Sequence, residues 1–458
     1  MSEVSNKEDP VSETTNPAHA RRLRRMNSLR PSVHSCAWTE PMLEALGRPG
    51  AEERRWHSLI DKVRKPEVIS AACTKVLANK GAPGVDHVTV AQYRDVCEHH
   101  NAELVRQLEE GSYRASELRR KDIPKAGSKE LRPLGIPTVQ DRIVQKAVVM
   151  VIEPIFEMEF SNRSYGFRPG LGCKDALREV DAWIQHGHRF VVDADIKAYF
   201  NNIPHGKLLK LVSKRIADGK MLELIQQFLE KGVLEEMENR RDHCGTPQGG
   251  VISPLLANIY LDPLDHLLAA AGLRCIRYAD DFVILCPSRE EAERGLELVR
   301  QWMAEAELEL HPQKTRIADL NEIGGHFEFL GYRFQQCKTR IKRWPRRKSW
   351  DKLMEALARH TPKNSGKSWD EIIRRVNATF KGWYEYFKHS AAATLERVDG
   401  RARRRMRSIL RARSGRKGSS KRGADHQRWP NKFFRSLGYR SLADAHELEL
   451  QSLRGHTR

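Results

Sequence analysis

Tyr278-Ala279-Asp280-Asp281 lies between two short apolar runs, Cys275-Ile276 and Phe282-Val283-Ile284-Leu285. Apolar residues on both sides of a compact acidic break predict a β-hairpin whose turn presents two adjacent carboxylates at the edge of a packed sheet. Neighbouring carboxylates repel unless a cation or a shared proton offsets the repulsion. Mg²⁺ suits this role because hard cations prefer carboxylate oxygen, and two such ions can clamp the reacting oxygens of a phosphoryl transfer. Taken alone, the tetrapeptide also fits an ordinary solvated turn.

A second acidic strand is expected upstream of this turn. Phe190-Val191-Val192-Asp193-Ala194-Asp195-Ile196 alternates so that apolar side chains share one face while Asp193 and Asp195 share the other. A lone acid there would also fit the wet side of an amphipathic strand. Between the acidic segments, Gly245-Thr246-Pro247-Gln248-Gly249-Gly250 forms a Gly/Pro loop that leads into a helix-like apolar run. The backbone of such a loop can approach a ligand closely.

The order of these motifs resembles that of the reverse transcriptase/maturase proteins encoded by bacterial group II introns. The other matching blocks are residues 79–86 (fingers extension), 123–125 with 132–137 and 141–145 (first polymerase block), 165–170 (second block), and 308–315 with 327–332 (last palm blocks). The resemblance implies an α+β right-hand polymerase fold. Fingers and a palm with an antiparallel sheet would be followed by an α-helical thumb/maturase domain.

The resemblance also implies a metal site. Asp195 and Asp280 match the family's metal ligands, with Asp281 as a supporting carboxylate and the Ile196 carbonyl as an extra ligand. Two Mg²⁺ ions, with Mn²⁺ as an alternative, would lower the pKa of a primer hydroxyl and neutralise a triphosphate. Asp193 is expected to be structural.

Nucleotide contacts are implied in the same way. The implied nucleotide-binding residues are Lys125, Arg132, Tyr199, Gln248 and Lys314, and the implied primer grip is Leu330 with Gly331. Lys125 and Arg132 would grip the triphosphate, whereas Lys314 would supply a proton or positive charge to the departing pyrophosphate. Tyr199 would act as a steric gate against ribonucleotides. The alternatives without a functional role are surface charges for the three cations, a core aromatic for Tyr199 and a loop residue for Gln248.

One block departs from the family pattern. The chain reads Ala198-Tyr199-Phe200-Asn201 where the family commonly has Gly-Phe-Phe-Asp. A ring is kept at the gate position, but Asn201 lacks a carboxylate and is given no metal role. The proposed aspartate set is intact, so an active polymerase is expected.

Composition favours a polyanionic partner. The 458 residues carry a net charge of +20, and residues 401–422 hold eleven Lys or Arg and no acid. A nuclear address or a disordered tail is the alternative for such a run. The eight cysteines form no C-x-x-C pair, which argues against a zinc site or a disulfide framework and fits a reducing cytoplasm. The acidic, Ser/Asn-rich start is unlike an Arg-rich transit peptide, so a bacterial, nucleoid-associated protein is expected. No apolar run is long enough to span a membrane.

The chain is expected to divide into a disordered tail (1–34), fingers and palm (35–336), a thumb/maturase domain (337–400) and a basic RNA/DNA-binding segment (401–458). Helical periodicity is expected at 175–185, 207–233, 348–360 and 369–389. Residues 377–387 resemble the maturase-specific segment, where Trp383 and Tyr386 are read as packing residues. Residues 428–434 through 441–442 resemble the closing segment of compact, class C-like members, and nothing after them resembles an H-N-H endonuclease, so none is expected. The expected RNA contacts are Lys381, Lys388, Arg403, Arg404, Arg405 and Arg407.

These features favour an RNA-directed DNA polymerase and intron maturase. It would bind group II intron RNA, assist splicing, and copy that RNA from a DNA primer with dNTPs during retrohoming, its affinity dominated by phosphate contacts. One alternative is a domesticated relative in phage defence, DNA repair or CRISPR adaptation. Another is an RNA-binding splicing factor with an inactive polymerase core. The maturase-like segment disfavours retron and diversity-generating polymerases.

Overall fold

The computed structural model describes residues 36–48, 50–51, 53–124, 131–231, 245–246, 249–415 and 422–455. The tail at 1–34, Lys125, Gln248 and the side chain of Arg132 lie outside the described residues. The chain forms two compact units. The first takes its described residues from Met1–Val180, Ala194–Phe282 and Arg294–Thr315, and the second from Asp181–Asp193, Val283–Glu293 and Arg316–Arg458.

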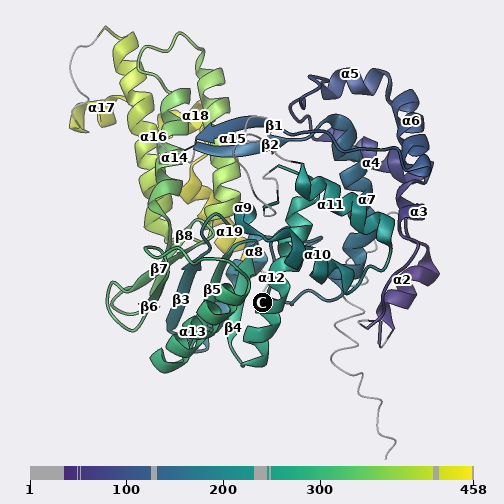
Figure 1. Cartoon of the computed structure of the whole chain (residues 1–458). Helices are drawn as coiled ribbons and strands as arrows, with labels where there is room; N and C mark the ends of the chain where they lie inside the picture. Colours follow the sequence, from purple (N-terminus) through teal and green to yellow (C-terminus); the bar gives the residue numbers. More distant parts are fainter. Residues whose placement is uncertain are drawn as a thin grey trace, which may run out of the picture. The chain divides into compact units, whose positions relative to one another are not determined.

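Helices and short strands alternate in the first unit, whose elements are labelled in Figure 1. Its helices are α2 (Glu40–Gly47), α3 (Ile60–Val63), α4 (Pro66–Ala78), α5 (Val90–Asp95), α6 (Cys97–Glu110), α7 (Val139–Glu157), α9 (Tyr199–Asn202), α10 (His205–Ser213), α11 (Gly219–Glu230) and α12 (Ser253–Ala270). Its strands are β1 (Arg119–Pro124), β2 (Leu131–Ile136) and β4 (Arg274–Tyr278). Four elements have residues in both units: α8 (Cys173–Gln185), β3 (Phe190–Asp195), β5 (Asp281–Cys286) and α13 (Arg289–Glu305).

The second unit contains a small sheet and a helical bundle. Its strands are β6 (Arg316–Asp319), β7 (His326–Phe329), β8 (Tyr332–Gln336) and β9 (Ile341–Pro345). Its helices are α14 (Arg347–His360), α15 (Trp369–Phe387), α16 (Ala392–Arg413), α17 (Arg422–Arg428), α18 (Asn431–Ser436) and α19 (Leu442–Gly455). Strands β7, β8 and β9 form an antiparallel meander.

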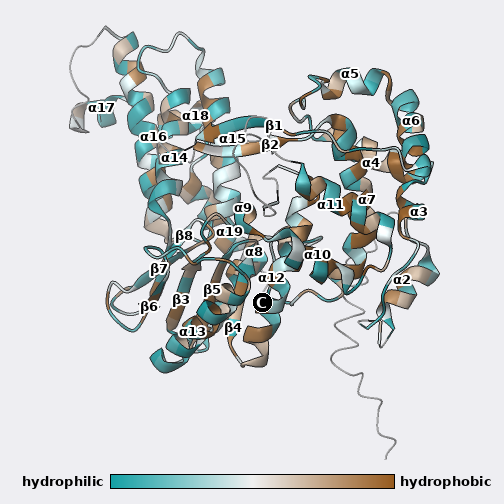
Figure 2. Ribbon diagram, viewed as in Figure 1, coloured by the Kyte–Doolittle hydropathy of each residue, from teal (hydrophilic) through white to brown (hydrophobic). Residues whose placement is uncertain are grey.

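The acidic hairpin predicted from the sequence is confirmed. Strand β4 ends at Tyr278 and β5 begins at Asp281, so that a two-residue turn carries Ala279 and Asp280. The sheet has the order β4-β5-β3-β6, and β3 pairs with β6 in antiparallel register. Hydrophobic residues dominate β3 and β5, whereas α16 is largely hydrophilic (Figure 2). Val191 is fully buried although it shares the acidic face of β3, so this face is not simply wet.

The helical pattern expected at 207–233 is divided into two helices in the structure, and residues 232–233 lie outside the described residues. The structure has two helices there, α10 and α11, because Asp218 begins a new one by accepting a hydrogen bond from Met221 N at 3.2 Å. The same carboxylate accepts bonds from the backbone of Leu59 and Ile60 at 2.6 and 2.8 Å. These partners are remote in sequence, so helical periodicity alone could not reveal the break.

The domain boundaries expected at 336/337 and 400/401 are corrected. The β8–β9 pairing runs across the first position, and α16 runs without interruption across the second. Leu395 and Met406 of α16 belong to one buried cluster with Phe434 of α18. The described residues of this part, 401–415 and 422–455, therefore contribute to the core of the helical bundle instead of forming a separate basic segment.

Candidate active site

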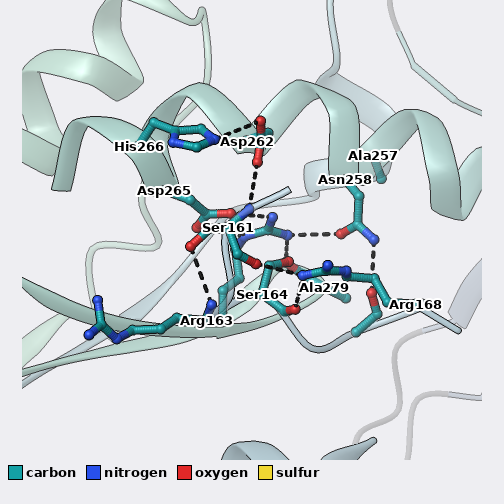
Figure 3. Close-up of polar contacts among 12 residues, drawn as sticks. Ser161, Arg163, Ser164, Arg168, Ala257, Asn258, Asp262, Asp265, His266 and Ala279 are labelled. Atoms are coloured by element: carbon teal, nitrogen blue, oxygen red, sulfur yellow. Dashed lines mark hydrogen bonds and ion pairs between the residues drawn. The ribbon is translucent and has the colours of Figure 1, made fainter. Parts of the chain in front are cut away.

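A buried arginine, Arg277, fixes the acidic turn, and Figure 3 labels three residues that accept its hydrogen bonds, Asn258, Asp265 and Ala279. Arg277, on β4, is 0% exposed, and its Nε and Nη2 donate to the Asp265 carboxylate on α12. Its Nη1 donates to Asn258 Oδ1 and to the carbonyl oxygen of Ala279, both at 2.9 Å. Burial is the largest single influence and acts to lower the pKa of Arg277, but the charge of Asp265, its hydrogen bonds to Arg277 and other neighbouring groups together raise this pKa. The peptide that precedes Asp280 is thus held by a guanidinium that stays charged.

A glycine backbone holds the same turn from another direction. A Cβ added at Gly166 would lie 2.2 Å from Ala279 N, so only glycine allows this approach. Asn258 Nδ2 donates to Gly166 O at 2.8 Å, and Tyr165 N donates to Arg277 O at 2.8 Å. The second polymerase block, which contains Gly166, therefore supports the turn through backbone contacts.

Arg168 stabilises the conformation of the segment that contains Gly166. Its Nη1 donates to the carbonyl oxygens of Ser161 and Ser164, and its Nη2 lies 2.5 Å from Glu157 Oε1 (Figure 3 shows the two serine contacts). The side chains of this ion pair are only 2% and 4% exposed. A buried pair of this kind gives the segment one fixed conformation.

Asp195, at the end of β3, contacts a cation. Lys314 Nζ donates to Asp195 Oδ2 at 2.5 Å, and the two side chains are 59% and 37% exposed. His311 N donates to Asp195 O at 2.7 Å, which secures the backbone of the strand end. The Asp195 carboxylate thus pairs with a cation at a position that solvent can reach. A ligand of a divalent cation must have both properties.

The Ile196 carbonyl is oriented away from the segment at 309–311, which pairs with the chain just after β3. Ile196 lies opposite Leu310 in an isolated antiparallel bridge, and the flanking bonds run from Lys197 N to Glu309 O and from His311 N to Asp195 O. In such a non-hydrogen-bonded pair the N–H and C=O of the central residue point to the other side of the strand. The Ile196 oxygen is therefore turned away from the 309–311 segment.

The aspartates do not form a three-carboxylate cage. Within the described ranges, no group of three or more His, Cys, Asp or Glu side chains is arranged so that it could hold a metal ion. Strands β3 and β5, which carry Asp195 and Asp281, are neighbours in the sheet. Mg²⁺ is commonly bound through one or two carboxylates together with substrate phosphates and water. The carboxylates of Asp195 and Asp281 fit such a site, in which substrate oxygens would complete the coordination.

Tyr199 lies in the core. It is 2% exposed, and its hydroxyl donates to Ala257 O at 2.6 Å. Burial raises the pKa of this hydroxyl well above its usual value, and the charge of Asp280 adds to the rise. The predicted contact of this ring with a nucleotide sugar disagrees with its burial here, and the alternative of a core aromatic agrees with it.

The predicted primer grip forms a tight turn in the second unit. Leu330 and Gly331 have φ of +47° and +83°, in the left-handed region. Tyr386 Oη donates to Leu330 O at 2.7 Å, and Ser349 Oγ donates to Gly331 O at 3.1 Å. The ring of Tyr386 stacks on Tyr332 at 5.9 Å, so its predicted packing role is confirmed. The contact to a primer stays a prediction.

Three of the expected RNA contacts are structural. Arg407 is 2% exposed and donates from Nε to Trp429 O at 2.9 Å, so its assignment to RNA is wrong. Arg405 donates from Nε to Thr361 Oγ1 at 2.7 Å, just beyond the last residue of α14. Lys388 pairs with Glu449. These contacts show that a basic run can supply core and capping residues as well as a charged surface.

The other three expected contacts remain accessible. Lys381 and Arg404 are exposed, and Arg403 is partly exposed. A surface contact with RNA is compatible with their positions.

Sequence reasoning missed the residues that support the turn. Asn258, Asp262 and Asp265 recur at helical spacing on α12, which is otherwise apolar. Polar residues on one face of a buried helix require partners, and Arg277, the fully buried one of the two arginines in β4, pairs with two of them, Asn258 and Asp265. Polar residues at helical spacing in an apolar helix, together with an arginine in a nearby strand, could therefore have indicated this support from the sequence.

Two segments match known family models. Residues 123–334 match the model for reverse transcriptase (RNA-dependent DNA polymerase), and residues 351–429 match the model for the group II intron maturase-specific domain. The chain belongs to the reverse transcriptase family and carries a group II intron maturase-specific domain.

Curated relatives agree with this membership. The group II intron-encoded protein LtrA of Lactococcus lactis subsp. cremoris is 40% identical over 206 residues, covering 44% of this chain and 34% of LtrA. This chain thus spans about a third of LtrA. Protein YkfC of Escherichia coli (strain K12) is 33% identical over 336 residues, covering 62% of this chain and 85% of YkfC.

Among solved structures, a partial Cas6-RT-Cas1–Cas2 complex is similar at 29% identity and a TM-score of 0.34, covering 54% of this chain and 41% of that one. In the described part of the chain, no helix is both long and apolar enough to cross a membrane.

Proposed function

We propose that this chain is an RNA-directed DNA polymerase that also serves as a group II intron maturase. The observation that carries the proposal is the set of buried hydrogen bonds by which Arg277 holds the acidic turn, here called the Arg277 clamp. Arg277 holds the carbonyl that precedes Asp280, and the next strand of the sheet ends at Asp195. Rigid support of this kind suits a site that must present charge at a fixed position.

Asp195 and Asp280 would hold Mg²⁺, with the Ile196 carbonyl as a further oxygen donor. When bound, Mg²⁺ supplies charge neutralisation at the triphosphate and lowers the pKa of the primer hydroxyl. Lys314 neutralises Asp195 while substrate is absent. Once the nucleotide is bound, the ammonium group of Lys314 would donate a hydrogen bond or a proton to the departing pyrophosphate.

The maturase role is proposed for the second unit. The printed name of LtrA refers to a group II intron, and the maturase-specific match covers 351–429 of this chain. Exposed Lys381 and Arg404 would contact phosphates of intron RNA, with dNTPs and a DNA primer as the substrates of the other unit. Affinity would depend on RNA shape and would fall steeply with salt.

Primer extension on an RNA template tests the polymerase. Asp280→Asn should lower the rate of dNTP incorporation in Mg²⁺ by on the order of 10²-fold or more. The matched control is Asp319→Asn on β6, whose carboxylate accepts bonds from Asn321 within its own turn. It should keep the wild-type rate. Equal incorporation by wild type and Asp280→Asn would exclude the proposed metal site.

The maturase role needs its own assay. The protein should bind the ribozyme RNA encoded around its gene more tightly than a size-matched unrelated RNA, and should accelerate its splicing at low Mg²⁺. An active polymerase without this preference would favour the domesticated alternative.

A further inference from the structure

We propose that a basic cavity in the second unit binds backbone phosphates of a polynucleotide. The cavity has a volume of about 710 Å³. It is lined by the C-terminal end of α8, by β9 with the turn before it, and by the segment that enters α16. All of these residues belong to one unit. The choice of a polynucleotide rests on the proposed function, but the site does not involve the acidic turn.

The cavity carries an excess of positive charge. Its charged lining residues are Asp181, Arg189, Arg340, Lys342 and Arg343. Arg343 Nη1 lies 2.5 Å from Asp181 Oδ2, so this pair neutralises itself. Across the described part of the chain, no carboxylate lies within ion-pair distance of the three other cations. Three unneutralised cations around one cavity attract an anion.

A helix N-terminus opens into the same cavity. Ala391, Ala392 and Ala393 line it, and α16, which begins at Ala392, is 22 residues long. The N-cap Ala391 provides no side-chain cap, and the first turn contains no acid. The first N–H groups of a helix lack intrahelical partners and carry the positive end of its dipole, which favours phosphate. Ala391 N donates to Arg343 O at 2.9 Å, so this helix end is tied to β9.

The lining favours a sugar-phosphate backbone over a free nucleotide. No Phe, Tyr or Trp is among the described residues that line the cavity, so it offers no indole, phenol or phenyl ring for base stacking. Its volume exceeds what a single phosphate requires and lies in the range of pockets that enclose larger groups. Cations and backbone N–H groups recognise phosphates without reading sequence. Binding should therefore be independent of base sequence.

Charge removal tests the cavity. A labelled single-stranded RNA is titrated at several salt concentrations, without dNTPs or divalent ions, so that an inactive polymerase would not affect the result. The double variant Arg340→Gln/Lys342→Gln should reduce the slope of log K against log salt by about 1.4, since each lost phosphate contact to a single strand removes about 0.7. The matched control is Lys338→Gln/Lys348→Gln, two exposed lysines outside the cavity. An unchanged slope in the cavity variant, or an equal loss in the control, would overturn the proposal.

A second pair of variants separates binding from folding. Ala392→Glu places a carboxylate at the N-terminus of α16, where it should maintain or raise the thermal unfolding midpoint while weakening RNA binding. Ala182→Glu adds the same charge at an exposed position of α8 outside the cavity and should bind RNA like wild type. Wild-type binding by Ala392→Glu would contradict the proposal.

Competition identifies the source of the phosphate. Inorganic phosphate at a concentration matched to the RNA phosphates should displace little labelled RNA from the wild-type protein, whereas unlabelled RNA and DNA strands should both displace it. Equal displacement by inorganic phosphate would assign the cavity to a free anion and overturn the polynucleotide.

Discussion

Lys314 Nζ lies 2.5 Å from Asp195 Oδ2, so an ammonium group contacts the carboxylate that the motif order assigns to a metal. Lysine and a divalent cation would therefore compete for one oxygen. Because 59% of the lysine side chain is exposed, it can move away without disrupting a core.

Lys314→Gln should change both the rate and the metal dependence. The rate of nucleotide addition should fall by about 10²–10⁴, the range for loss of a general acid. The Mg²⁺ concentration for half-maximal rate should decrease, because no ammonium competes for Asp195. Lys197→Gln is the matched control, since Lys197 pairs with Glu309 at 2.8 Å and lies on the same strand end. A wild-type rate and Mg²⁺ midpoint in Lys314→Gln would contradict this role.

Arg277→Leu should destabilise the first unit strongly. The substitution leaves Asp265 buried without its partner, which typically costs about 3–5 kcal/mol of the free energy of unfolding. Urea unfolding measures the loss. Arg289→Leu removes an arginine whose pair with Glu293 spans 4.0 Å at the surface, and it should cost less than about 1 kcal/mol. Equal stability of the two variants would show that the clamp contributes little.

Gly166→Ala should displace the acidic turn. The added methyl group would meet Ala279 N at 2.2 Å, and a backbone atom cannot move aside without moving the residue after it, Asp280. Primer extension should slow, and the unfolding midpoint should fall. Gly206→Ala on α10 has nothing within 4 Å of the new methyl group and should stabilise the chain by about 0.4–1 kcal/mol. Full activity of Gly166→Ala would show that the turn tolerates the shift.

His266 should make stability depend on pH in the alkaline range. A hydrogen bond to Asp262 is the main cause that raises the pKa of His266 from 6.5 to about 9. A group whose pKa is raised by folding stabilises the fold fully below its unfolded pKa, and this contribution is lost as pH rises through the folded value. The free energy of unfolding should therefore fall between pH 6.5 and about 9, modestly because 58% of the side chain is exposed.

His266→Gln should flatten this part of the pH profile. Chemical denaturation across the range provides the measurement. A variant that keeps the full alkaline decline would assign it to another group.

Short-range patterns predicted the acidic hairpin and β3, because alternation and turn chemistry are local. They could not predict that Tyr199 is buried, since its hydroxyl partner, Ala257 O, lies 58 positions away. Arg407 shows the same limit. It stands in a basic run, yet it faces the core beside Met406, where the carbonyl of Trp429 accepts its hydrogen bond.

Support for the site was also beyond local pattern. The interaction between Arg277 and Asp265 joins a strand to a helix. In the sequence, each residue alone is a charged residue within a largely apolar segment, with no indication of its partner. The proposed domain boundary within α16 failed for a related reason. Composition changes at residue 401, but the buried face that includes Ala402 and Ile409 continues through it.

The most direct test of the central claim is a double-mutant cycle on Asp195→Asn and Asp280→Asn, with single-turnover primer extension on RNA as the readout. If both carboxylates serve one metal site, the double variant should be slower than the slower single variant by no more than about tenfold, since residues that act as a unit are strongly non-additive. Effects that add fully, or a wild-type rate in either single variant, would contradict a shared site.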